Sequence, residues 1–206
     1  MLIMELKKAA RCRNVNGKAL FLHFGICLSF LLIILTPKVT QAQLELYGKF
    51  NTDGSIEPVI NYLGSKKVSP KFAITFFGLV RQKWSQALIG ASFTPTPNIS
   101  LSASVGIEHG HHLPRYSASL WVKKGQNTFL LLGELGDGYR NYLYKVNIFH
   151  QFSEKTSLGI MDWRFHGIGP NFRYTIKKIE STLWIMPAYD HEAKVARCMV
   201  GYSLHM

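Results

Sequence analysis

The sequence predicts an all-β protein: an antiparallel up-and-down transmembrane β-barrel of about twelve strands, with ten also possible, after an N-terminal signal peptide. Three observations predict this fold. A basic and then apolar segment opens the chain, period-two alternation recurs from residue 44 onward, and the two faces of the alternating segments differ in charge. The 206 residues, 47% of them hydrophobic and 17% charged, are enough for one folded domain and are untypical of a disordered chain.

The first 42 residues have the three parts of a secretory signal. A basic stretch over residues 7–18 precedes a mostly apolar run from Leu20 to Leu35, and Thr40-Gln41-Ala42 supplies a cleavage site. An uncleaved signal anchor is the alternative, but the 16-residue run makes only ~24 Å of helix, short of a ~30 Å hydrocarbon core. We therefore expect a signal peptide at 1–42 and a β-barrel domain at 43–206.

Loss of the signal leaves a basic chain with one cysteine. The whole chain carries a net charge of +12, and the segment after residue 42 carries about +7. Because the chain is exported, lipopolysaccharide, an acidic envelope polymer or an acidic solute is a better partner than nucleic acid. Cys198 alone remains, so no intramolecular disulfide is expected.

From Leu44 onward the chain lacks helical spacing and alternates with period two between turn signals. Over 100–108, the apolar series that includes Leu101 and Val105 alternates with serines, Gly106 and Glu108. Turn signals place the strands near 44–51, 55–64, 71–81, 84–94, 98–108, 115–124, 127–136, 139–152, 156–166, 170–178, 181–188 and 194–205. An even number of such segments is typical of membrane barrels.

The connections also sort by side. Tight, lysine- and proline-rich turns fall at one end, whereas the longer connections at 109–114, 136–140, 166–171 and 189–194 fall at the other. Short periplasmic turns opposite longer outer loops are typical of outer-membrane barrels.

A soluble barrel also alternates, with its apolar face inward, so the direction of the faces needs separate support. The apolar faces carry almost no charge, while the opposite faces carry Lys49, Arg81, Lys123, Lys145, Arg164, Arg173, Lys177 and Arg197 together with Glu45, Glu57, Glu108, Glu134 and Asp162. Mixed charge suits a wet lumen. Aromatic residues near strand ends, such as Tyr47, Tyr116, Trp163 and Phe172, are expected to form an interfacial girdle.

Some segments depart from this pattern. The stretches 129–132 and 183–186 are apolar on both faces, and Pro58 and Pro187 interrupt segments that should donate hydrogen bonds. These places are expected to be bulges, edges or miscounted strands, which is why ten strands stay possible. The chain also ends on Leu204-His205-Met206 rather than on an aromatic residue.

The signal, the alternating segments and the basic polar face together resemble the small bacterial outer-membrane β-barrel proteins, which include oligosaccharide-specific porins and the outer-membrane phospholipase. The resemblance covers the whole mature chain as architecture only. It implies an outer-membrane location. No residue motif of either family is present, so no functional position is carried over.

The favoured function, in preference to an enzyme, is a narrow channel or a porin-like envelope protein whose basic lumen attracts anionic small solutes or oligosaccharides. The predicted selectivity residues are Lys49, Lys123, Lys145, Arg164, Arg173, Lys177 and Arg197. Membrane lipid and lipopolysaccharide are the expected partners, without nucleic acid or cofactor. The oligomeric state is left open.

The alternative is an outer-membrane hydrolase or a metal- or ligand-binding barrel that uses its histidine-rich outer loops. The candidate metal ligands are His109, His111, His112, His166 and His191. Solvated loop histidines are the more ordinary interpretation, since ligands on separate loops rarely preorganise a site. Ser117 and Ser119 lie near histidines as candidate nucleophiles, but no Gly-x-Ser-x-Gly motif occurs, and serines at 100, 102 and 104 alternate likewise without a histidine.

Overall fold

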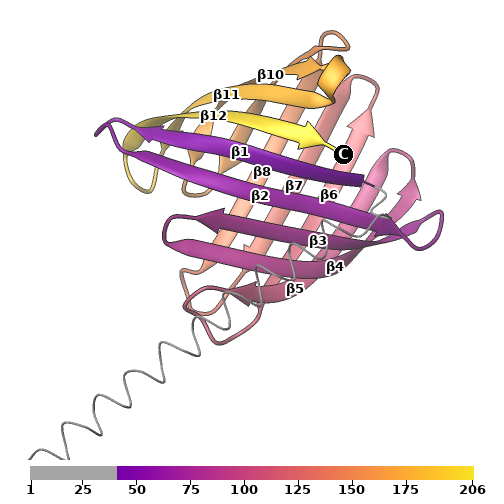
Figure 1. Ribbon diagram of the computed structural model, residues 1–206, viewed down its shortest axis with the longest axis horizontal. Helices are drawn as coiled ribbons and strands as arrows, with labels where there is room; N and C mark the ends of the chain where they lie inside the picture. Colours follow the sequence, from indigo (N-terminus) through magenta and orange to yellow (C-terminus); the bar gives the residue numbers. More distant parts are fainter. Residues whose placement is uncertain (1–40) are drawn as a thin grey trace, which may run out of the picture. The chain divides into compact units, whose positions relative to one another are not determined.

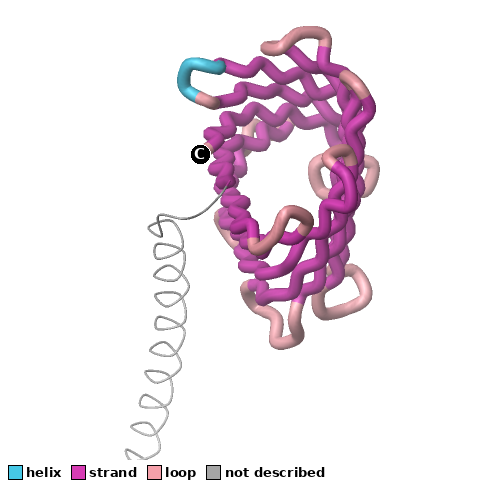
Figure 2. Tube along the Cα trace, turned by 90° about the vertical axis from the view of Figure 1, so that its right-hand side faces the viewer, coloured by secondary structure: helices cyan, strands magenta, loops and turns pink. Residues whose placement is uncertain are grey.

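A computed structural model describes residues 41–206, which form a closed barrel of twelve antiparallel strands (Figures 1 and 2). The strands are β1 (Gln41–Asn51), β2 (Ile56–Lys67), β3 (Phe72–Arg81), β4 (Trp84–Thr96), β5 (Ile99–Glu108), β6 (Arg115–Lys124), β7 (Asn127–Leu135), β8 (Tyr142–Gln151), β9 (Thr156–Trp163), β10 (Gly167–Ile176), β11 (Ser181–Asp190) and β12 (Val195–His205). A short 3-10 turn (Lys177–Ile179) precedes β11. The predicted up-and-down barrel of twelve strands is confirmed, and the ten-strand alternative is wrong.

Each strand pairs with its neighbours in the sequence, and the pairing of β1 with β12 closes the ring. The register runs from Gln43 opposite His205 to Asn51 opposite Arg197. Between β4 and β5 the register shifts between Phe93 and Thr96, beside Pro95, which cannot donate a ladder hydrogen bond. Among residues 41–206 no helix is long and apolar enough to cross a membrane.

The chain termini of the barrel lie side by side. The backbone N–H of Ala42 donates to the carbonyl of Met206 at 2.8 Å, and the N–H of Met206 donates back at 2.7 Å. The predicted signal segment up to residue 40 lies outside the described residues, and the predicted cut after Ala42 falls inside β1. The cleavage site stays a prediction, and a cut there would remove this last pair of closing hydrogen bonds.

The outer face of the barrel is apolar and exposed. Its side chains include Leu46, Ile60, Val80, Ile89, Val105, Ile107, Ile148, Ile160, Ile185 and Val200, each at least 43% exposed. Their neighbours in the sequence point inward. An apolar outer band around a closed ladder matches the hydrocarbon core of a membrane, where every backbone group must be paired within the protein. The apolar-outward assignment therefore holds over the soluble alternative.

The buried core lies inside the barrel. A cluster of inward side chains from β1, β2, β3, β8, β9, β11 and β12 packs across the lumen: Tyr47, Val59, Leu79, Phe149, Met161, Trp163, Trp184, Met186, Ala188 and Met199. Met186 and Met199 are completely buried. The segments that are apolar on both faces are therefore regular strands, since the inner residues of 183–186 fill the lumen and those of 129–132 line it. Pro58 keeps its place in the ladder with β1, whereas beside Pro187 the ladder between β10 and β11 is interrupted, passing from Ile168–Tyr189 to Phe172–Ile185.

Two assignments of side-chain direction were wrong. Tyr47 and Trp163 do not belong to an interfacial girdle, because both are buried in the lumen cluster. Asp162 is not a lumen residue: it lies between the inward Met161 and Trp163, in register with Val146 and Ile168 on the outer face. Outward aromatic residues do occur near strand ends, among them Tyr116, Tyr142, Phe172 and Tyr189.

Candidate functional site

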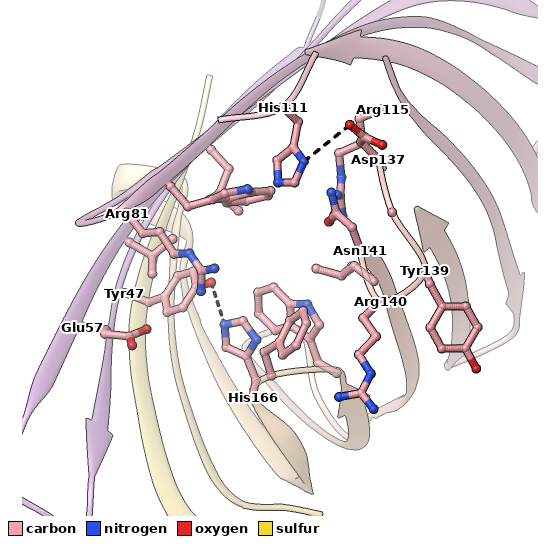
Figure 3. Close-up of a pocket in the computed structure, with 17 residues that line it drawn as sticks. Tyr47, Glu57, Arg81, His111, Arg115, Asp137, Tyr139, Arg140, Asn141 and His166 are labelled. Atoms are coloured by element: carbon pink, nitrogen blue, oxygen red, sulfur yellow. Dashed lines mark hydrogen bonds and ion pairs between the residues drawn. The ribbon is translucent and has the colours of Figure 1, made fainter. Parts of the chain in front are cut away.

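The lumen holds two cavities that meet near the middle of the barrel. The outer cavity, of about 440 Å³, lies at the end with the longer loops and is lined partly by the loop between β7 and β8 (Figure 3). The inner cavity, of about 640 Å³, reaches the chain termini at His205 and Met206. Leu79, Leu143 and Trp163 line both cavities. The lumen is therefore a candidate passage with a narrowing between its two halves.

One wall of the inner cavity is a ladder of small hydroxyl side chains on β4, β5 and β6. It consists of Ser92, Ser100, Ser102, Ser104, Ser117 and Ser119. The register places Ser102 opposite Ser119, with their Oγ atoms 2.6 Å apart, and Ser104 opposite Ser117. Small inward side chains leave space along this side of the lumen, so we call this the open wall.

The opposite side is packed with rings, and we call it the filled wall. Tyr47 Oη lies 3.0 Å from His166 Nε2, and the His166 ring stacks on Trp163 with centroids 3.6 Å apart. Tyr47 also contacts the Trp184 ring at 5.5 Å. These side chains come from β1, β9, β11 and the turn at 164–166, and they close the lumen between those strands.

The turn at 164–166 carries His166 into the lumen. Phe165 (φ 68°) and Gly167 (φ 101°) take left-handed conformations that reverse the chain within three residues. Burial is the main cause that lowers the pKa of His166 well below 6.5. The nearby cations Lys49, Lys145 and Arg81 lower this pKa further, whereas a hydrogen bond to the Arg164 carbonyl raises it. His166 is therefore neutral at physiological pH.

Two arginines fix this turn to its neighbours. Arg164 Nε pairs with Glu192 Oε1 at 2.9 Å, and its Nη1 donates to the carbonyls of Arg140 and Tyr142. Arg197 Nη1 donates to the Phe165 carbonyl at 2.8 Å, and its Nη2 pairs with Asp190 at 3.1 Å. Both guanidinium groups therefore hold the turn in place and have their charge matched locally.

A buried ionic network lies at the outer end of the open wall. Arg115 pairs with Glu108 at 2.9 Å and with Glu134 at 2.8 Å, and its Nη1 also donates to Asn141 Oδ1 at 2.9 Å. None of the three charged side chains is more than 4% exposed. Because Asn141 belongs to the loop between β7 and β8, this network ties that loop to the barrel wall (Figure 3).

The predicted selectivity residues fall into three groups. Lys49 pairs with Glu57 at 2.6 Å, and Arg164 and Arg197 are paired as described above. Lys145 and Arg173 make no ion pair within residues 41–206; Lys145 Nζ lies 3.9 Å from the Trp163 ring centre, and Arg173 Cζ lies 4.0 Å from that of Phe149. Lys123 is exposed at the inner end of β6, and Lys177 pairs with Glu154 in the 3-10 turn. Their role in selectivity stays a prediction.

Sequence reasoning left Arg81 out of the selectivity set, although its alternation placed it inward. Arg81 lines the outer cavity and a neighbouring hollow of about 630 Å³, and it makes no ion pair in the described part of the chain. Its guanidinium lies 5.1 Å from the Trp84 ring centre. The sequence shows which cations face inward, but only the fold shows which of them have a carboxylate partner.

The candidate metal-binding histidines do not converge. His166 is buried against Tyr47, and His111 Nδ1 lies 4.0 Å from Asp137 Oδ2 in the outer cavity. His109, His112 and His191 are exposed on loops. Over residues 41–206 no group of three or more histidine, cysteine or acidic side chains is arranged to hold a metal ion. Of the two candidate nucleophiles, Ser119 is hydrogen-bonded to another serine of the open wall.

Comparisons with known proteins support the architecture. No protein-family model matches the chain, and no curated protein matches its sequence.

Among solved structures, the KdgM porin is 13% identical, and the match covers 79% of this chain and 98% of the porin chain with a TM-score of 0.55. Omp33 of Acinetobacter baumannii is 11% identical over 83% of this chain and 100% of its own, with a TM-score of 0.53. The NanC porin is 7% identical over 78% and 98%, with a TM-score of 0.52. The chain therefore has the fold of bacterial outer-membrane porins, as its sequence pattern predicted.

Proposed function

We propose that this protein is a porin-like channel of a bacterial outer membrane that passes small anionic solutes. The observation that carries the proposal is a set of inward cations that have no carboxylate partner within residues 41–206: Arg81 at the outer cavity, Lys145 at the inner cavity and Arg173 nearer the inner end. Such charges raise the local concentration of anions within the lumen. The apolar outer band supports the membrane location.

The acidic groups of the lumen limit this preference. Glu45 faces inward, makes no ion pair in the described part of the chain, and accepts hydrogen bonds from Asn61 and Ser203. The Arg115 network holds two carboxylates against one guanidinium. We therefore expect moderate anion selectivity and not strict exclusion of cations.

Acidic oligosaccharides are the solute class that this lumen suits best. The KdgM porin has been solved in complex with disordered oligogalacturonate, an acidic sugar chain. In the present lumen, the serines of the open wall offer hydrogen bonds to sugar hydroxyls, while Lys145, which lines the same cavity, offers a partner for a carboxylate. The dispersed histidines and the paired serines give no comparable support to a hydrolase or a metal site.

The test is the reversal potential across a planar bilayer under a salt gradient. The variant Lys145→Glu with Arg173→Glu should shift selectivity towards cations. A matched control, Lys49→Gln with Glu57→Gln, removes a neutral ion pair and should leave selectivity unchanged. The preference should weaken at high salt, because screening shortens to ~3 Å at 1 M. Cation preference in the unmodified protein, or no shift in the charge-reversed variant, would exclude these cations as the selectivity element.

A further inference from the structure

The narrowing between the two cavities has a composition of its own. Leu79 on β3, Leu143 on β8 and Trp163 on β9 are the residues that border both the outer and the inner cavity. Leu79 and Trp163 belong to the buried lumen cluster, and Leu143 packs against it. Every solute that moves between the cavities passes these three side chains.

We infer that Leu79, Leu143 and Trp163 form an apolar neck that limits the flow of small hydrated ions and selects solutes at the middle of the channel. The inference rests on the proposed channel function and identifies the part of the lumen that sets its conductance. An apolar constriction offers no hydrogen bonds to water, so water leaves it readily and hydrated ions cross it slowly. The cavities on either side carry charged and hydroxyl side chains that the neck lacks, so the neck is the point of highest resistance.

Trp163 is held firmly on its side of the neck. His166 stacks on its ring at 3.6 Å with an interplanar angle of 10°, and Tyr47 contacts it at 5.7 Å. The indole Nε1 is buried and has no hydrogen-bond partner within the described residues. Ring contacts, and no hydrogen bond of its own within residues 41–206, therefore hold this indole in place.

Two cations that make no ion pair among the described residues flank the neck. Arg81 lines only the outer of the two cavities, and Lys145 lines only the inner one, where it lies 3.9 Å from the Trp163 ring centre. An anionic solute therefore meets an attractive charge before and after the apolar step. This arrangement favours a solute long enough to contact both cations over a small ion that must cross unaided.

The experiment replaces the two leucines by asparagine, whose side chain has the same branching and the same number of heavy atoms. Leu79→Asn with Leu143→Asn makes the neck polar while keeping the branched outline of its side chains, so single-channel conductance in potassium chloride should rise by about twofold or more. Leu130→Asn is the matched control, since Leu130 lines the inner cavity but not the neck, and it should leave conductance unchanged. Heat-modifiable gel migration establishes that each variant is a closed barrel.

The outcomes separate the neck from the channel. Folded neck variants with the conductance of the unmodified protein, or an equal rise in Leu130→Asn, would overturn the neck while the channel stands. If the double variant does not fold, Leu143→Asn alone decides, because Leu143 is the more exposed leucine of the pair. Absence of current in every folded protein would instead overturn the proposed function and the neck with it.

Discussion

The open wall and the filled wall share one sequence pattern on their outer faces and differ completely on their inner faces. On β5 the inward positions are Ser100, Ser102 and Ser104, whereas on β11 they are Thr182, Trp184 and Met186. Both strands present aliphatic residues to the outside. The outer face is constrained by the membrane alone, but the inner face decides how much of the lumen stays empty. The size of the inward side chains, and not the number of strands, therefore shapes the passage.

The first prediction compares packing on the filled wall with packing beside the inner cavity. Trp184→Ala removes a ring from the filled wall and should lower the free energy of unfolding by about 3–5 kcal/mol, because it leaves a cavity. Leu130→Ala, on a side chain that borders an existing cavity, should cost clearly less. Urea unfolding in detergent micelles measures both. Equal costs would mean that the lining of the inner cavity is packed as tightly as the filled wall.

The second prediction concerns how the open wall is held at its outer end. Arg115→Met leaves Glu108 and Glu134 buried without their cation and should lower the free energy of unfolding by about 3–5 kcal/mol. The exposed pair of Lys177 and Glu154 provides the control, and Lys177→Gln should have no measurable effect. A tolerated Arg115→Met would show that packing alone holds this end of the wall.

The third prediction separates the two faces of a single open-wall strand. Val105→Arg places a charge on the outer face and should cost about 2–4 kcal/mol of barrel stability in lipid, whereas Ser104→Arg enters the lumen and should be tolerated. The folded fraction in lipid vesicles reports the difference. Equal tolerance of both substitutions would remove the apolar-outward assignment.

The fourth prediction is a pH dependence of the protein's stability that originates at His166 on the filled wall. The pKa of His166 is well below 6.5 in the folded protein and ordinary in the unfolded chain, so the unfolded state binds more protons as the pH falls below about 6.5. Stability should therefore decline below that pH as His166 is forced towards its charged form. In His166→Asn this part of the decline should disappear. An identical decline in both proteins would assign it to other groups.

The sequence predicted the outer face of this barrel far better than the inner one. The alternation that includes Leu101 and Val105 predicted that this segment is a strand and which of its side chains face outward. It could do so because the membrane requires an apolar side chain at every second residue of a strand. Tyr47 and Trp163 were misplaced because an aromatic ring near a strand end suits both a membrane interface and a filled lumen. Ion pairs such as that of Arg164 with Glu192 join residues far apart in sequence, so no local pattern predicts which inward cations stay unpaired.

The most direct test of the two-wall account is thiol labelling from water. With Cys198 replaced by serine, Ser102→Cys on the open wall and Met186→Cys on the filled wall are treated with a small anionic, membrane-impermeant thiol reagent in folded protein. The account predicts fast labelling at position 102, because it borders the inner cavity, and no labelling at position 186, because that side chain is completely buried. Equal labelling at both positions, or protection of position 102, would contradict it.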